Sequence, residues 1–264
     1  QIPARECRAV FIRTDPPFDE AYLTATWLLE FAERSGVTLI NSPRGIRSAN
    51  EKIYALEFPQ LCPDTLITSS RDEIIKFLKQ SGGKLIAKPL NGFGGSGVIL
   101  IEKSAMKSIS SLLDFYIDNK DGTTNYVILQ DYIEGADQGD VRILLLNGQP
   151  IGAMKRVPGS EDHRSNVSAG GSVQKHQLSK QEKELCRRIG PTLVRDGLYF
   201  VGIDVINGML VEVNVMSPGG ITYMNKVYKS KVQEKVIDFV EDKVEQRVTA
   251  FERRKKLRQT VNEA

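Results

Sequence analysis

The segment Asn91–Gly97 most constrains what this chain can fold into, because four of its seven residues are glycines. It lies between two apolar segments, Lys84–Lys88 and Val98–Ile101, which the residue pattern predicts as strands. Glycines let backbone N–H groups approach an oxyanion closely, so the loop is a candidate phosphate-binding segment. It is not a P-loop, since no Gly-Lys-Ser/Thr follows, and it is not a dinucleotide fingerprint, since no helix follows. An ordinary hairpin loop stays open as the alternative.

Lys88 strengthens the phosphate-binding interpretation. It ends the predicted strand Lys84–Lys88, directly before the glycine-rich loop. A lysine at the end of a buried strand can neutralise a phosphate. The alternative is a lysine whose stem follows the apolar surface while its ammonium reaches solvent.

A second polar group lies on a predicted hairpin, Phe200–Ile206 and Leu210–Asn214, which turns around Asn207-Gly208. Glu212 and Asn214 are two residues apart, so their side chains share one face. Asp204 faces Glu212 if the loop has three residues, whereas a strict two-residue turn pairs Asp204 with Val211. Such hard oxygen ligands suit Mg²⁺. A solvent-facing polar stripe is the alternative.

The third group is cationic and comprises Arg142, Arg156 and Arg164. Developing charge on a transferred phosphoryl group requires such donors. Taken singly, each is more typical of an ordinary surface arginine. The long polar segment Gly159–Gly171, which contains Arg164, has the composition of a mobile lid or of a plain surface loop.

The order of predicted elements indicates an α/β unit followed by α+β structure. Strand Arg8–Arg13, helix Glu20–Arg34 and strand Val37–Ile40 form a unit that predicts a parallel strand pair. We expect Gly190-Pro191 to interrupt or bend a helix over Ser179–Arg195. The other predicted elements are helices over Asn50–Phe58, Ser70–Gln80 and Tyr228–Arg258, strands over Leu66–Thr68 and Tyr126–Gln130, and a hairpin of Val141–Leu146 and Pro150–Lys155 around Asn147-Gly148.

The composition excludes several function classes. The formal net charge is only +3, and the basic run at Arg253–Lys256 is more typical of a solvated helix end than of a nucleic-acid contact. The three cysteines form neither a disulfide framework nor a zinc spacing. No apolar run approaches the roughly 18 residues that span a bilayer. We therefore expect a cytoplasmic protein without nucleic-acid or membrane partners.

Together these residues resemble the bacterial-type glutathione synthetases of the ATP-grasp superfamily, from about Ala9 to Asp242. The most specific segment is Arg13–Asp19, Arg-Thr-Asp-Pro-Pro-Phe-Asp, which separates this family from most other ATP-grasp ligases. The other matching segments are Asn50–Lys52, Lys88–Gly95, Arg164–Gly171, Gly190-Pro191, Phe200–Asp204 and Glu212–Pro218.

The resemblance implies an α+β ATP-grasp fold, in which two α+β lobes clasp ATP, preceded by the remnant of an α/β parallel-sheet domain. It implies the end of a substrate domain over residues 1–48 and a small lobe with the glycine-rich loop over 49–124. A large lobe with the metal site and lid follows over 125–247, then a basic helical tail over 248–264. Family members carry roughly another quarter of a chain before the position of Ala9, so the chain is expected to be the later part of a longer protein.

The resemblance also assigns roles to residues. Nucleotide-binding residues would be Lys52, Lys88, Gly92, Phe93, Gly94, Gly95, Ser96 and Gly97 at the phosphates, with Gln130, Asp131, Tyr132 and Ile133 at the adenine. The catalytic arginines would be Arg142 and Arg164. Substrate contacts would come from Arg13, Asp15, Asp19, Arg156, Asn166, Ser217, Gly219 and Gly220. Magnesium, or manganese in its place, would be bound by Asp204, Glu212 and Asn214.

The implied reaction is the ATP-dependent joining of γ-glutamylcysteine and glycine through an acyl phosphate, in a homo-oligomeric enzyme. Two alternatives stay open. One is a related ATP-grasp ligase with a different acid and amine. The other is a nucleotide-binding module without ligase activity.

Overall fold

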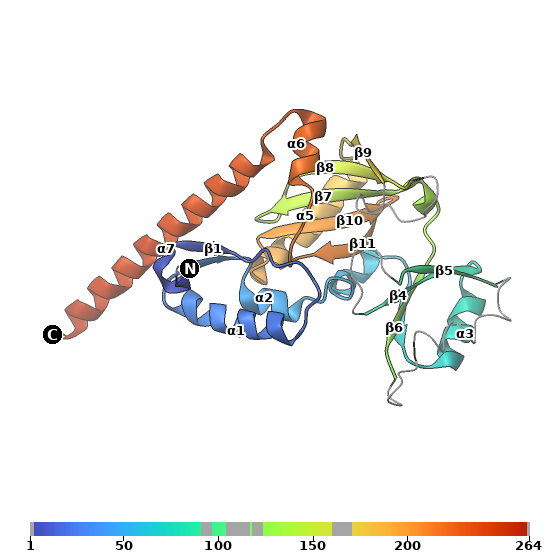
Figure 1. Ribbon diagram of the computed structural model, residues 1–264, viewed down its shortest axis with the longest axis horizontal. Helices are drawn as coiled ribbons and strands as arrows, with labels where there is room; N and C mark the ends of the chain where they lie inside the picture. The colour runs from blue at the N-terminus through green and yellow to red at the C-terminus, as the bar shows by residue number, and fades with distance from the viewer. Residues whose placement is uncertain (1–2, 91–96, 104–116, 118–123, 160–170, 263–264) are drawn as a thin grey trace.

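A computed structural model describes residues 3–90, 97–103, 117, 124–159 and 171–262 of the chain, with the backbone path alone for 254–262. Its strands form three sheets: a parallel pair β1-β2, a four-stranded sheet β3-β6-β4-β5 and a five-stranded sheet β11-β10-β7-β8-β9 (Figure 1). None of the helices in this described part has the length and apolar character needed to cross a bilayer.

The first unit consists of β1 (Ala9–Phe11), α1 (Glu20–Arg34) and β2 (Thr38–Ile40), and its strands pair in parallel as predicted. The carboxylate of Asp19 starts α1 by accepting a hydrogen bond from the Tyr22 backbone N–H at 2.8 Å. Helix α2 (Pro43–Ser48) was not predicted, although a proline at the first helical position is a recognised start signal.

The four-stranded sheet forms the small lobe, with β3 (Thr65–Thr68), β4 (Lys84–Pro89), β5 (Ile99–Glu102) and β6 (Val127–Asp131). Helix α3 (Arg71–Gln80) packs on it through Ile74 and Leu78, which share a core with Leu85 and Leu129. Strand β6 lies between β3 and β4. The expected large lobe, 125–247, was to begin with this strand, but β6 belongs to the sheet of the small lobe.

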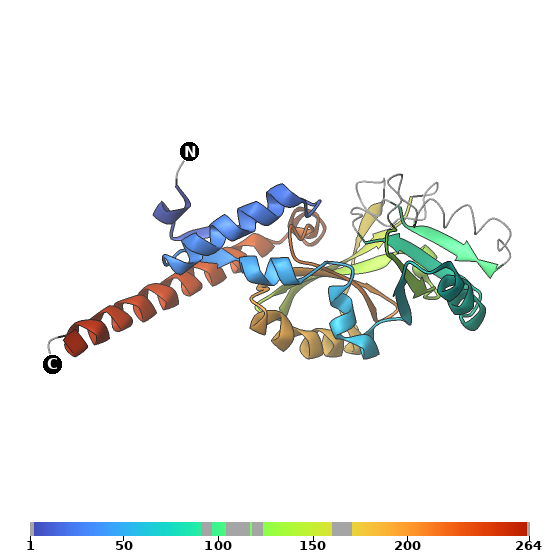
Figure 2. The same ribbon diagram turned by 90° about the horizontal axis from the view of Figure 1, so that it is seen from below.

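The five-stranded sheet forms the large lobe, with β7 (Asp140–Leu146), β8 (Gln149–Val157), β9 (Ser172–Lys175), β10 (Phe200–Ile206) and β11 (Met209–Asn214). Helix α5 (Lys180–Arg195) covers one face, while α6 (Ile221–Tyr228) and α7 (Val232–Asn262) lie on the other side (Figures 1 and 2). The far part of α7 projects beyond the body of the molecule. The last helix, expected from about Tyr228, begins at Val232 as α7. Helix α6, which ends at Tyr228, was not predicted, and Lys229 with its φ of 52° lies between the two helices.

Of the two effects expected at Gly190-Pro191, an interruption or a bend, the interruption was wrong, because α5 is continuous through Pro191. The glycine has another function: a Cβ on Gly190 would lie 2.4 Å from the carbonyl oxygen of Gly148. Gly148 belongs to the β7–β8 turn, so this close backbone contact fixes the helix against the hairpin.

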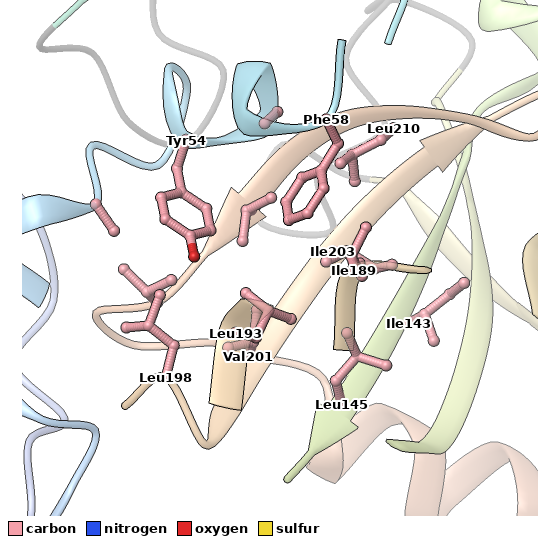
Figure 3. Close-up of a cluster of buried hydrophobic side chains, with 14 of the residues drawn as sticks. Tyr54, Phe58, Ile143, Leu145, Ile189, Leu193, Leu198, Val201, Ile203 and Leu210 are labelled. Atoms are coloured by element: carbon pink, nitrogen blue, oxygen red, sulfur yellow. The ribbon is translucent and has the colours of Figure 1, made fainter. Parts of the chain in front are cut away.

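The single helix expected over Asn50–Phe58 was also wrong. The chain makes two short 3₁₀ helices instead, η2 (Tyr54–Glu57) and η3 (Pro59–Leu61). Tyr54 and Phe58 pack into the same core as the α5 residues Ile189 and Leu193, above strands of the large lobe (Figure 3). This packing anchors the turn that carries Lys52 to the five-stranded sheet.

Candidate active site

The hairpin β10–β11 places Asp204 opposite Glu212. The combination of turn and register differs from both alternatives considered from the sequence, the three-residue loop and the strict two-residue turn. The turn has two residues, Asn207 and Gly208, with φ values of 46° and 76°. Val205 pairs with Leu210, and the next pair is Asp204 with Glu212, so a bulge in β11 absorbs one residue. The bulge restores the pairing that a strict two-residue turn would lose.

Asp204 lies between two buried arginines. Arg142 donates to both of its carboxylate oxygens, with Nη2 2.9 Å from Oδ2, and Arg156 Nη2 lies 2.9 Å from Oδ1. Arg156 also forms a bidentate pair with Asp140, at 2.6 Å for each bond. Burial alone would raise the pKa of Asp204, but Arg142 and Arg156 outweigh it and hold that pKa well below its ordinary value.

Glu212 has the opposite environment. Burial, followed by repulsion from Asp204, raises the pKa of Glu212 to about 7, and Lys88 opposes this shift. Within the described part of the chain, no side chain or backbone N–H donates a hydrogen bond to its carboxylate. The neighbouring Asn214 donates from Nδ2 to Asp204 Oδ2 at 3.3 Å and to the Gly202 carbonyl at 3.2 Å.

Two lysines from other elements face these carboxylates. Lys88, at the end of β4, donates to Gln130 Oε1 at 2.7 Å, and Lys52 donates to the Pro89 carbonyl at 2.6 Å. Burial lowers the pKa of both, to about 8 for Lys52, while attraction to Glu212 opposes the shift. The small lobe, the turn before η2 and the large lobe therefore all contribute charged groups to one site.

The donor set fits a hard divalent cation that also binds phosphate. No group of three or more His, Cys, Asp or Glu side chains close enough to hold a metal occurs among the described residues. The expected set has two carboxylates and one amide, and among the described residues no cation forms a hydrogen bond with the buried carboxylate of Glu212. Such a set suits Mg²⁺, which is commonly held by one or two carboxylates together with nucleotide phosphates and water.

The expected adenine-binding residues lie where the chain passes from one sheet to the other. Gln130 and Asp131 end β6, and Tyr132 and Ile133 follow in the connection to β7. Gln130 is buried and bonds both Lys88 and Thr65. The segment therefore has the position of a hinge between the lobes (Figure 1).

Some of the expected substrate residues gather beside Arg142. Arg142 Nη1 donates to the Gly219 carbonyl at 3.3 Å, and Arg13 Nη1 donates to the Pro218 carbonyl at 2.9 Å. Ser217 Oγ lies 3.4 Å from the Arg13 carbonyl.

Three other expected substrate residues lie differently. Gly220 forms the N-cap of α6, Asp15 is exposed, and the carboxylate of Asp19 caps α1. Of the expected loop residues, Gly97 is described with a φ of 72°. Those outside the described residues are Gly92, Phe93, Gly94, Gly95, Ser96, Arg164 and Asn166.

Two residues of the site were missed. Asp140 holds Arg156, and its position two residues before Arg142 on one strand already placed it on the same face. Glu51 Oε1 accepts hydrogen bonds from the backbone N–H groups of Val215 and Met216, at 2.7 and 3.0 Å. It was present in the Asn50–Lys52 motif, but local sequence gives no signal for a bond to a segment so distant.

Solved structures with the same fold define the class. The chain superposes on a D-cycloserine synthetase with a TM-score of 0.68 at 16% identity, covering 93% of this chain and 86% of that one. It also superposes on the D-alanine–D-alanine ligase of Bacillus anthracis, solved with ATP, with a TM-score of 0.56 at 14% identity, covering 83% and 75%. The fold is the ATP-grasp fold.

Sequence comparison identifies the family within this class. The models of the prokaryotic glutathione synthetase ATP-grasp and N-terminal domains match residues 51–229 and 1–47. The glutathione synthetase of Thermosynechococcus vestitus is 40% identical over 235 residues, 89% of this chain and 72% of that protein. That of Bradyrhizobium diazoefficiens is 42% identical over 89% of this chain and 73% of that protein. The chain belongs to the prokaryotic glutathione synthetase family, and it is an ATP-dependent ligase that forms carbon–nitrogen bonds.

Proposed function

We propose that the chain joins γ-glutamylcysteine to glycine at the expense of ATP, giving glutathione, ADP and phosphate. The observation that carries this proposal is the meeting of Lys88 from the small lobe with Asp204 and Glu212 from the large lobe, in a chain of this family. Cations on one lobe and metal-binding oxygens on the other suit a nucleotide triphosphate held between them.

In this proposal, Lys52 and Lys88 bind the nucleotide phosphates. Both are partly desolvated, and a phosphate would offset the burial that lowers their pKa values. Gln130 holds the Lys88 ammonium in place through its 2.7 Å bond, and Gln130–Ile133 line the adenine site. The residues of the glycine-rich loop, Gly92–Gly97, would cover the phosphates.

Arg142 is proposed to stabilise the charge that develops when the cysteinyl carboxylate attacks the γ-phosphate. Its guanidinium is fixed by Asp204 and by the Gly219 carbonyl, so it needs no reorganisation during the reaction. The acyl phosphate is then attacked by the amine of glycine, and phosphate leaves. Arg156, Arg164, Asn166, Ser217 and Gly219 would bind the substrate carboxylates, with Arg164 and Asn166 in a lid that excludes water.

Magnesium, with manganese as a substitute, is proposed at Asp204, Glu212 and Asn214. The ion would neutralise phosphate charge in the transition state. Glu212 is the most specific indicator, because ionising a carboxylate with so little stabilisation favours a bound cation.

The test is ADP release measured with γ-glutamylcysteine and glycine, and with a panel of other acids and amines. We expect release to require both γ-glutamylcysteine and glycine, with glutathione identified by mass spectrometry. Faster release with another pair would support a related ligase of different specificity. A rate of ADP release that does not depend on the acceptor amine would support a nucleotide-binding module without ligase activity.

A further inference from the structure

Residues 215–220 connect β11 to α6, and two of their carbonyl groups hold arginines of the site. Arg13 Nη1 donates to the Pro218 carbonyl at 2.9 Å, and Arg142 Nη1 donates to the Gly219 carbonyl at 3.3 Å. A guanidinium group follows the acceptors to which it is bonded. The position of this connecting segment therefore helps to set where the two guanidinium groups lie.

Glu51 holds the start of the connecting segment. Its Oε1 accepts hydrogen bonds from the backbone N–H groups of Val215 and Met216, at 2.7 and 3.0 Å. Its backbone carbonyl accepts a third, from the Val213 N–H at 3.0 Å. Strand β11 lies at an edge of its sheet, where backbone groups need partners from outside the sheet. Glu51 thus takes the place of a neighbouring strand along this edge.

Asn41, which follows β2, holds the same segment through a carbonyl group. Its Nδ2 donates to the Val215 carbonyl at 2.8 Å and to the Phe200 carbonyl at 2.7 Å, and its Oδ1 accepts from the Phe200 N–H at 2.6 Å. The Asn41 side chain is buried. Both backbone polar groups of Val215 are therefore bound by side chains that come from distant parts of the sequence.

We propose that Glu51 is a positioning residue for the ligase reaction, which acts through residues 215–220 on Arg142. The inference rests on the proposed function, in which Arg142 stabilises the charge that develops on the transferred phosphoryl group. Glu51 acts by the reach of its acceptor oxygen, which keeps the Gly219 carbonyl in place beneath the guanidinium group. Its negative charge is not the cause, because burial raises the pKa of Glu51 and so disfavours the ionised form.

Two substitutions of Glu51 separate reach from charge. Glu51→Asp keeps the carboxylate but withdraws it by one methylene group, about 1.5 Å. Glu51→Gln keeps an acceptor oxygen at the original distance and removes the charge. Because a displacement of about 1 Å can cost about a hundredfold in rate, Glu51→Asp should lose about that factor in kcat, and Glu51→Gln should be at least about tenfold faster than Glu51→Asp. The opposite order would overturn the inference, because it would assign the effect to charge.

The measurement is ADP release with γ-glutamylcysteine and glycine at saturation, expressed per nucleotide-binding site. Calorimetric titration with a non-hydrolysable ATP analogue and magnesium counts these sites and gives the Kd. The Kd of Glu51→Asp should stay close to that of wild type, because Lys88 and Gln130 belong to the small lobe. A loss of sites that accounts for all of the lost turnover would indicate a purely structural role and would overturn the inference. Glu57→Asp, at an exposed glutamate of η2, is the matched control and should keep the wild-type kcat.

A double-mutant comparison tests whether the effect passes through Arg142. In an Arg142→Lys background the guanidinium fork is already lost, so Glu51→Asp should lower kcat by less than about threefold further. A further loss of about a hundredfold, the value expected in the wild-type background, would show that Glu51 acts by another route.

Failure of the proposed function gives a different result. Wild type would then form no glutathione from γ-glutamylcysteine and glycine. The Glu51 variants can still be compared with whichever acid and amine supports ADP release in wild type, so the two failures are distinguishable.

Discussion

Asp204 and Glu212 are directly paired, yet their surroundings give them opposite properties. Asp204 has two arginines as partners and stays ionised, whereas Glu212 has none within hydrogen-bond distance and its pKa rises to about 7. Asp204 therefore organises the arginines even without ligand. Glu212 is the group whose ionisation depends on an arriving cation.

Glu212→Gln should abolish magnesium-dependent turnover, because an amide cannot supply the negative charge that the ion requires. The measurement is the rate of ADP release over a magnesium titration, with Glu57→Gln as the matched control. Full activity in Glu212→Gln would contradict the metal assignment.

Asp204→Asn should destabilise the fold by about 3–5 kcal/mol, because it leaves Arg142 and Arg156 buried without their shared charge. Urea denaturation at pH 7 without nucleotide measures this change. Glu212→Gln is the informative comparison: it removes a poorly stabilised charge, so its free energy of unfolding should equal or exceed that of wild type. Equal destabilisation by both changes would show that the two carboxylates are not distinguished as described.

At the scale of elements, glycines and a buried carboxylate fix how neighbouring segments meet. Gly190 in α5 touches Gly148 in the β7–β8 turn, and Glu30 in α1 binds two arginines of α2 and one of its own helix. Both contacts join elements that local sequence treats as independent.

Gly190→Ala should destabilise the protein by about 1–3 kcal/mol, although alanine favours a helix by about 1 kcal/mol over glycine. The added methyl group would collide with the Gly148 backbone, which cannot move away as a flexible side chain could. Thermal and urea unfolding measure the effect. Gly82→Ala, where the new atom meets open space, should change stability by less than about 0.5 kcal/mol.

Glu30 predicts a specific loss of stability in acid. Hydrogen bonds from Arg44, Arg34 and Arg47 lower its pKa to about 2, below the ordinary value of 4.5. A depressed folded-state pKa means that the stabilisation is complete above about pH 4.5 and is lost as the pH falls toward 2. The difference in unfolding free energy between wild type and Glu30→Gln should therefore shrink over that range. A pH-independent difference would contradict this account, and Glu57→Gln, at an exposed glutamate, is the control.

At the scale of the whole molecule, the site exists only where the two lobes meet. The four-stranded sheet supplies Lys88 and Gln130, whereas the five-stranded sheet supplies the carboxylates and arginines. The chain crosses between the sheets through the segment after β6. A nucleotide bound between them would contact both lobes and should stabilise them together.

A non-hydrolysable ATP analogue with magnesium should therefore raise the free energy of unfolding by about 2.7 kcal/mol at 100 times its Kd. Lys88→Met should remove most of this gain, because the small lobe then loses its phosphate contact. Differential scanning calorimetry with and without the analogue gives the comparison. An undiminished gain in Lys88→Met would contradict the role of Lys88 at the phosphates.

The sequence by itself determined the helices, strands and turns that depend only on interactions between residues close together in the chain. Period-two and helical patterns identified most strands and helices, Asn-Gly turns identified both hairpins, and the spacing of Glu212 and Asn214 fixed their common face. Together with the family motifs, this was enough for the fold class and the ligase activity.

Only the tertiary structure decided the features that depend on distant partners. The bulge in β11 sets the pairing of Asp204 with Glu212, β6 joins the small-lobe sheet, and Glu51 bonds the end of β11. In each case backbone hydrogen-bonding groups must find partners far along the chain. Such partners follow from packing of the complete molecule, and no local pattern of residues encodes them.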